Sequence, residues 1–102
     1  MRREEALKAL AEYRDRIDEV DRELLTLLNA RTRVVEEIGR VKREARMAIY
    51  EPKREDEVFH NVTGNNQGPL TAEAVRRIFE RIIDEMRKIQ RERMVEPDGE
   101  RS

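Results

Sequence analysis

Residues 4–46 read EEALKALAEYRDRIDEVDRELLTLLNARTRVVEEIGRVKREAR, and this stretch decides the fold. It contains no proline, and its only glycine is Gly39. Apolar residues recur every seven positions in two interleaved registers, and this spacing predicts one long helix with an apolar seam. One position of the seam is polar, Arg31. The seam consists of Leu10, Tyr13, Ile17, Val20, Leu24, Leu27, Val34, Ile38, Val41 and Ala45.

Such a helix is too long for the rest of the chain to cover. About 43 helical residues extend roughly 65 Å, whereas a compact domain of this size has a radius of gyration of about 13 Å. An apolar seam that stays exposed to water calls for a partner. We therefore expect an obligate homodimer of two-fold symmetry, in which a second copy covers the seam.

The composition fits one small domain and excludes several classes of function. The 102 residues are 44 % charged with mean hydropathy -0.93, yet a sustained heptad pattern argues against disorder. The net charge of -1 gives no global basic footprint for nucleic acid. The chain has no cysteine, which excludes disulfides and thiolate chemistry. No segment resembles a signal peptide or membrane span, so we expect a cytoplasmic protein.

Two shorter helices are predicted after the long one. Pro52 suits the first turn of a helix that continues to about Thr63. The sequence GNNQGP at residues 64–69 favours a loop. Thr71 is the expected N-cap of a third helix, which we end near Arg93. The fold class is therefore all-α with three helices per chain, one very long, one short and one medium. We assign residues 1–94 to the domain and 95–102 to a flexible tail or linker remnant.

Arg31 and Lys42 are cations that the long helix places on one side. Eleven residues correspond to a rotation of roughly 20° and a rise of roughly 16 Å, so both side chains can converge on a small anion. Val35 and Ile38 between them would form an apolar floor. The alternative is a structural salt bridge from Arg31 to Glu55 or Glu85, because a buried guanidinium needs a partner.

Several other polar residues have both a structural and a functional interpretation. Arg14 is a solvated flank by helix geometry, although an antiparallel partner could present it to the anion site. Of Arg54 and Glu55, at least one should face inward, given the apolar residues one turn later. Gln90 lies on an apolar stripe as either a satisfied core amide or a ligand contact. His60 has no neighbours in sequence that suggest a triad or metal site, so it is expected at the surface.

Taken together, these residues resemble the all-helical chorismate mutases, the AroQ class. The resemblance rests on Arg14 in YRDRID, Arg31 in LLNARTRVV, Lys42 in EIGRVK, the run YEPKRE, and Gln90 in the third helix. It covers about residues 7–92. YEPKRE followed by NNQGPL is most similar to mutase domains fused to bacterial DAHP synthases, so a DAHP synthase is a candidate partner.

The resemblance implies an intertwined homodimer with two equivalent active sites and no cofactor or metal. The reaction would be the Claisen rearrangement of chorismate to prephenate, a step of the shikimate pathway toward phenylalanine and tyrosine. Two carboxylates of chorismate, its ether oxygen and its ring hydroxyl would be recognised separately. By position, the resemblance implies that Arg31 and Arg14 of the partner subunit bind the two carboxylates, with Arg54 nearby. Lys42 and Gln90 would donate hydrogen bonds to the ether oxygen. Glu55, assisted by Glu51, would accept a hydrogen bond from the ring hydroxyl.

The chemistry of this reaction agrees with the polar residues of the chain. A pericyclic rearrangement needs neither a nucleophile nor a proton transfer, only a compact substrate and donors aimed at developing charge. Lys42 is the residue expected to matter most, since it meets charge that grows in the transition state. Val35 and Met86 would line the pocket. Met86 replaces a residue that is often small or hydroxylated in the family, and Glu51 stands where some members have aspartate.

Three alternatives remain open at this point. Isochorismate-pyruvate lyase shares the fold and much of the cationic pocket. A regulatory module of a DAHP synthase would bind chorismate or prephenate without turnover. A non-enzymatic helical scaffold would use Arg31 in structural salt bridges and would tolerate leucine there.

Overall fold

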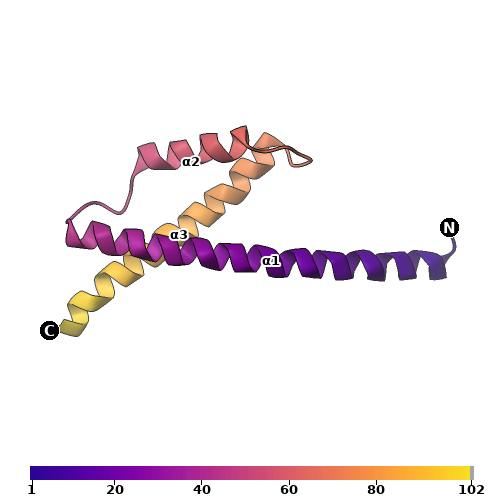
Figure 1. Ribbon diagram of the computed structural model, residues 1–102, viewed down its shortest axis with the longest axis horizontal. Helices are drawn as coiled ribbons and strands as arrows, with labels where there is room; N and C mark the ends of the chain where they lie inside the picture. Colours follow the sequence, from indigo (N-terminus) through magenta and orange to yellow (C-terminus); the bar gives the residue numbers. More distant parts are fainter. Residues whose placement is uncertain (102) are drawn as a thin grey trace. The chain divides into compact units, whose positions relative to one another are not determined.

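A computed structural model describes residues 1–101, with side chains for residues 1–93, as three helices (Figure 1). They are α1 (Arg3–Glu44), α2 (Pro52–Gly64) and α3 (Ala72–Arg101). Residues 1–101 contain no strand, and the prediction of an all-α chain with three helices is confirmed. No helix among the described residues is both long enough and apolar enough to cross a membrane.

Helix α1 ends in a Schellman motif at its carboxyl terminus. The Met47 N–H donates to the Lys42 carbonyl at 2.7 Å, and the Arg46 N–H donates to the Arg43 carbonyl at 3.2 Å. Arg46 takes the left-handed conformation that this motif requires, with φ of 57°. The motif ends the helix at Glu44, two residues before the end of the predicted stretch.

Both later helices begin as predicted. Pro52 occupies the first turn of α2, where its missing N–H is not needed. The hydroxyl of Thr71 accepts a hydrogen bond from the Ala74 N–H at 3.0 Å and caps α3. In the connecting loop, Gly68 has φ of 78°, a conformation that favours glycine.

Helix α3 continues to Arg101 and is longer than predicted. The prediction stopped near Arg93 because the apolar periodicity ends there, but a helical backbone does not require a buried face. The tail or linker assigned to residues 95–102 stays a prediction, since Ser102 and the side chains of residues 94–102 lie outside those that the structure describes.

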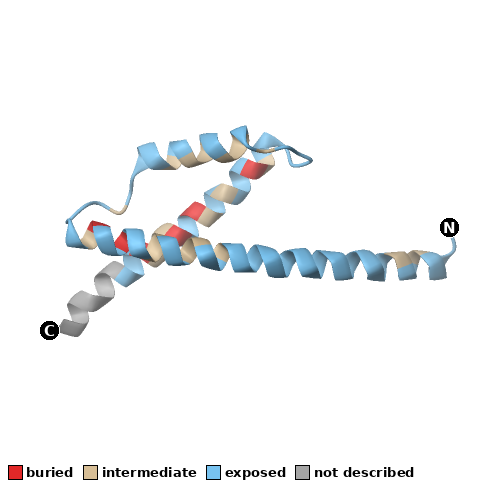
Figure 2. Ribbon diagram, viewed as in Figure 1, coloured by how far each residue is buried: buried red, intermediate tan, exposed pale blue. Residues whose placement is uncertain are grey.

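The chain divides into two units, Met1–Arg33 and Val34–Ser102. The second unit holds the small core (Figure 2), formed where α2 packs against α3. On α3 the buried apolar residues are Val75, Ile83 and Met86. On α2 the half-buried apolar residues are Val58, Phe59 and Val62, the face that the sequence predicts.

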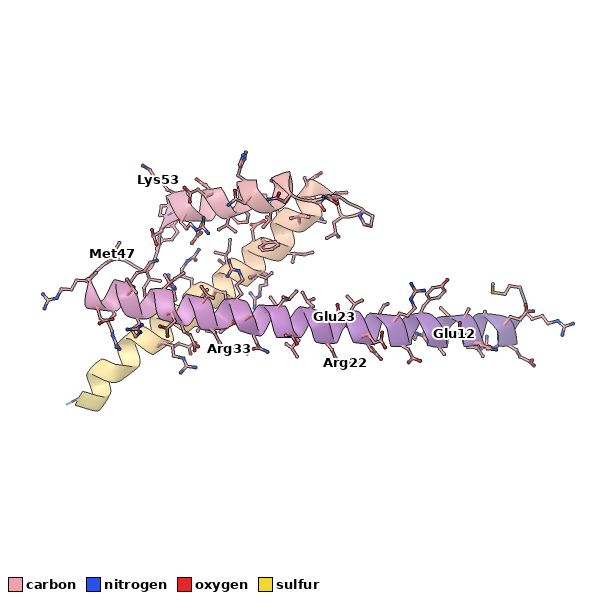
Figure 3. The ribbon with its side chains drawn as sticks, viewed as in Figure 1. Glu12, Arg22, Glu23, Arg33, Met47 and Lys53 are labelled. Atoms are coloured by element: carbon pink, nitrogen blue, oxygen red, sulfur yellow. The ribbon has the colours of Figure 1, made fainter. Side chains whose placement is uncertain are left out.

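The first unit is a single segment of α1 whose apolar seam is open within this chain. Figure 3 shows side chains projecting from this segment in all directions, with Glu12, Arg22 and Glu23 among them. The seam residues Leu10, Tyr13, Ile17, Val20, Leu24 and Leu27 are 44–67 % exposed. In the second unit the seam residues Val34, Ile38 and Val41 are exposed as well. One chain therefore leaves the predicted seam without a cover.

Candidate active site

One face of the last turns of α1 carries the polar core of the second unit. Val35, Gly39 and Lys42 follow one another at spacings of four and three residues, which places them on the same side of the helix. Gly39 and Lys42 are both buried. This face receives α3, since a Cβ atom added at Gly39 would lie 3.4 Å from Cγ of Gln90.

Lys42 is 7 % exposed, an unusual position for an ammonium group. Its Nζ donates to the backbone carbonyl of Ile49 at 2.8 Å and lies 2.6 Å from Oε1 of Glu51. The Schellman motif turns the chain back at Met47, so the segment after α1 can supply both acceptors. An ammonium has three N–H donors, so these two contacts account for two of them.

Gln90 is equally buried and is held by the backbone of α1. Its Nε2 donates to the Val35 carbonyl at 3.1 Å, and the absent side chain of Gly39 leaves room for its methylene groups. The core-amide interpretation of Gln90 is therefore confirmed, whereas its contact with a ligand stays a prediction. The amide still has a second N–H that can donate elsewhere.

Glu55 faces α3 and pairs with Arg87. Nε and Nη2 of Arg87 lie 3.1 and 2.5 Å from the same carboxylate oxygen, Oε2. The guanidinium also lies 5.0 Å from the centroid of the Tyr50 ring. The hydrogen bond to Glu55 is the main cause that raises the pKa of Arg87 above its already alkaline ordinary value. Arg87 therefore keeps its positive charge at every pH below that range, and the hydrogen bond to Glu55 favours this charged form.

Arg54 turns away from this pair. It is exposed, and its Nη1 lies 3.2 Å from Glu57 one turn along α2. Of the two adjacent residues, Glu55 is the one that faces inward, as the sequence predicts for at least one of them. Within this chain Arg54 thus pairs with Glu57 and leaves Glu55 to Arg87.

The remaining predicted residues are distributed over both units. Met86 is buried in the core of the second unit, and Val35 is half-buried. Arg14, which is exposed, and Arg31, which is half-buried, belong to the first unit. The two carboxylates considered as partners of Arg31 engage other arginines, with Arg81 lying 2.8 Å from Glu85 and Arg87 binding Glu55.

Arg87, Ile49 and Gly39 were not among the residues predicted for the site. Arg87 could have been found, because it lies four residues after Ile83 and three before Gln90, on the edge of the apolar stripe of α3. Nothing in the sequence marks the Ile49 carbonyl as a partner of Lys42, because the position of a backbone acceptor depends on the path of the chain. Gly39 was visible as the only glycine of the long helix, a position where close approach of another element is common.

The site offers fixed N–H donors rather than nucleophiles. Among the described residues, no group of three or more His, Asp or Glu side chains could hold a metal ion. His60 is exposed on α2, as predicted. The buried ammonium of Lys42 on α1 and the buried amide of Gln90, which packs from α3 against the same face of α1, can orient an anionic ligand and stabilise charge that develops on its oxygen atoms. The fold defines an all-α domain of three helices, and its polar core holds N–H donors that can bind an anion.

The chain belongs to the chorismate mutase type II family, whose model matches residues 13–91. It is 37 % identical over 82 residues to the bifunctional chorismate mutase/prephenate dehydratase of Neisseria gonorrhoeae. The matched region covers 80 % of this chain but only 22 % of that protein. This chain thus spans about a fifth of the length of that curated relative.

Solved structures of the same class are similar along almost their whole length. The chorismate mutase of Thermus thermophilus (form II) is 36 % identical, with a TM-score of 0.79 over 81 % of this chain and 94 % of the other. The chorismate mutase of Helicobacter pylori in complex with prephenate is 29 % identical, with a TM-score of 0.81 over 87 % and 97 % of the two chains.

Proposed function

We propose that this chain is a chorismate mutase that converts chorismate to prephenate. The observation that carries the proposal is the buried ammonium of Lys42, fixed by Ile49 and Glu51 on the same helix face that receives Gln90. Burying an ammonium costs free energy, and Lys42 offsets that cost through its contacts with Ile49 and Glu51. The family to which the chain belongs supplies the reaction class, and the likeness to a mutase that binds prephenate supports the substrate class.

In the proposed reaction the protein performs no covalent step. The ether C–O bond of chorismate breaks while a C–C bond forms in the same molecule, and negative charge grows on the ether oxygen. The third N–H of Lys42 and the second N–H of Gln90 would donate to that oxygen. Since the donors are already fixed by the protein, little reorganisation is needed when the charge develops.

The rest of the site recognises the ends of the substrate. Glu55 would accept the ring hydroxyl with help from Glu51, and Arg31 would bind one carboxylate. We assign the second carboxylate to Arg14 of a partner subunit, with Arg54 in a supporting role. Val35 and Met86 would form the apolar lining.

This arrangement requires a homodimer, and the exposed seam supports one. Nine large seam residues are open to solvent along α1, from Leu10 to Val41. A second copy of the same helix would cover them and would carry its own Arg14. Among residues 1–93, the buried apolar residues are Val75, Ile83 and Met86, which form a small core for a lone domain.

The domain partner of this chain is a separate question. The Neisseria relative is named as a mutase combined with a prephenate dehydratase, which differs from the fusion to a DAHP synthase that YEPKRE and NNQGPL resemble. We retain a DAHP synthase as a candidate partner. Co-purification of the two proteins, with a change in synthase activity, would support that partnership, and its absence at micromolar concentration would end it.

The direct test is to mix the purified chain with chorismate, follow its ultraviolet absorbance and identify the product. Prephenate at enzymatic turnover establishes the proposed function. Release of pyruvate from isochorismate, with no turnover of chorismate, would instead identify a lyase. Chorismate binding without turnover would identify a regulatory module, and no binding of either compound would leave a scaffold.

A further inference from the structure

Arg87 is a half-buried cation of α3 that reaches across to α2. It binds Glu55 through Nε at 3.1 Å and Nη2 at 2.5 Å. We propose that Arg87 is a positioning residue that fixes the Glu55 carboxylate so that Glu55 can accept the ring hydroxyl of the substrate. This inference rests on the proposed function and extends it to a residue that does not itself touch the substrate.

The geometry of the pair leaves one side of the carboxylate open. Both hydrogen bonds from Arg87 end on Oε2, whereas an ordinary bidentate pair uses both carboxylate oxygens. Oε1 thus stays available as an acceptor in a direction that the guanidinium fixes. A carboxylate that was only a structural partner would gain more by using both of its oxygens.

Arg87 is itself held from two further directions. Its guanidinium lies 5.0 Å from the centroid of the Tyr50 ring, and its Nη1 lies 3.4 Å from Oδ1 of Asp84. Tyr50 precedes Glu51, the residue that binds Lys42. The cation therefore links the carboxylate of α2 to the short segment that also fixes the buried ammonium.

A neighbouring ion pair on α3 provides the contrast. Arg81 and Glu85 lie 2.8 Å apart with side chains 76 and 47 % exposed, and pairs of this kind contribute little. The side chains of Arg87 and Glu55 are only 21 and 22 % exposed and come from different helices. Arg81 is therefore a matched control for the removal of an arginine from α3.

The test compares Arg87→Gln and Arg81→Gln in steady-state turnover of chorismate. We expect Arg87→Gln to raise KM about tenfold with kcat changed less than about threefold, because a bond to the ring hydroxyl is present in ground and transition states alike. Arg81→Gln should leave both constants unchanged. An Arg87→Gln enzyme with the KM of the unmodified chain would overturn the inference.

A double-substitution cycle separates positioning from a general structural effect. If Arg87 acts through Glu55, then adding Arg87→Gln to Glu55→Gln should raise KM no further. Multiplicative losses would show that Arg87 acts independently and would overturn the proposal. If Arg87→Gln does not fold, Arg87→Lys serves instead: a single nitrogen cannot make both bonds, so KM should rise, and an unchanged KM counts against the idea.

The same measurements distinguish this inference from the function on which it rests. If the unmodified chain does not convert chorismate, both the proposed function and the role of Arg87 are overturned. If the unmodified chain converts chorismate and Arg87→Gln loses thermal stability but keeps its KM, the proposed function stands. Only the positioning role of Arg87 is then overturned.

Discussion

The ammonium of Lys42 lies 2.6 Å from Oε1 of Glu51, a residue beyond the end of its own helix. The pairing depends on the sharp reversal at Arg46 and Met47, which returns the chain toward the helix it has just left. A half-exposed carboxylate thus compensates the charge of a buried lysine.

Lys42→Ala should lower kcat/KM for chorismate by about 100-fold or more, the scale of losing one preorganised donor to developing charge. Steady-state kinetics checks this, with circular dichroism to confirm that the helices persist. The control is Lys53→Ala, because Lys53 is exposed in the first turn of α2 and points outward (Figure 3). A loss of less than tenfold would move the catalytic role away from Lys42.

Arg31→Leu should abolish most activity while leaving the helix content intact. The substitution restores an apolar residue to the seam, which favours stability, but removes the proposed partner of a substrate carboxylate. Thermal unfolding and chorismate turnover measured on one sample separate the two effects. Full activity in a more stable variant would show that Arg31 is structural.

Gly39→Ala should stabilise α1 by about 1 kcal/mol, since alanine is the better helix former. The new Cβ would meet Cγ of Gln90 at 3.4 Å, an ordinary contact, so activity should persist. Gly39→Val is the matched comparison, because its extra methyl groups must displace Gln90 and should reduce turnover by at least about tenfold. Equal turnover in the two variants would show that the position of Gln90 does not affect catalysis.

Arg46→Gly should raise the free energy of unfolding by about 1 kcal/mol relative to Arg46→Ala. Glycine adopts the left-handed conformation of the Schellman motif without the steric penalty of a Cβ atom, whereas alanine keeps that penalty. Denaturant unfolding at one fixed protein concentration measures the difference. Indistinguishable midpoints would mean that the φ of 57° carries no cost at this position.

Leu24→Lys should dissociate the proposed dimer and unfold the chain at micromolar concentration, because a charge enters the apolar seam. Sedimentation velocity checks this against Ala11→Lys, an exposed position outside the seam. The unmodified chain should sediment at twice its mass of 12.2 kDa. A compact monomer of the unmodified chain would contradict the homodimer.

The local features of the fold were predictable because they depend on neighbouring residues. The heptad pattern predicted α1, Pro52 the start of α2, and Thr71 the cap of α3, and each is found. The end of α3 was placed too early, at Arg93, because periodicity reports burial rather than backbone conformation. Lys42 and Gln90 also stood out as polar residues that the structure finds buried.

The partners of these residues were not predictable in the same way. From the sequence, Arg31 was the arginine considered as a partner of Glu55, whereas the packing of α2 on α3 brings Arg87 to that carboxylate. The carbonyl of Ile49 reaches Lys42 only because the chain reverses at Arg46. The sequence by itself determined the helices and the polar residues, since periodicity and capping are local. The tertiary structure decided which charges meet, because ion pairing between helices depends on how their faces pack.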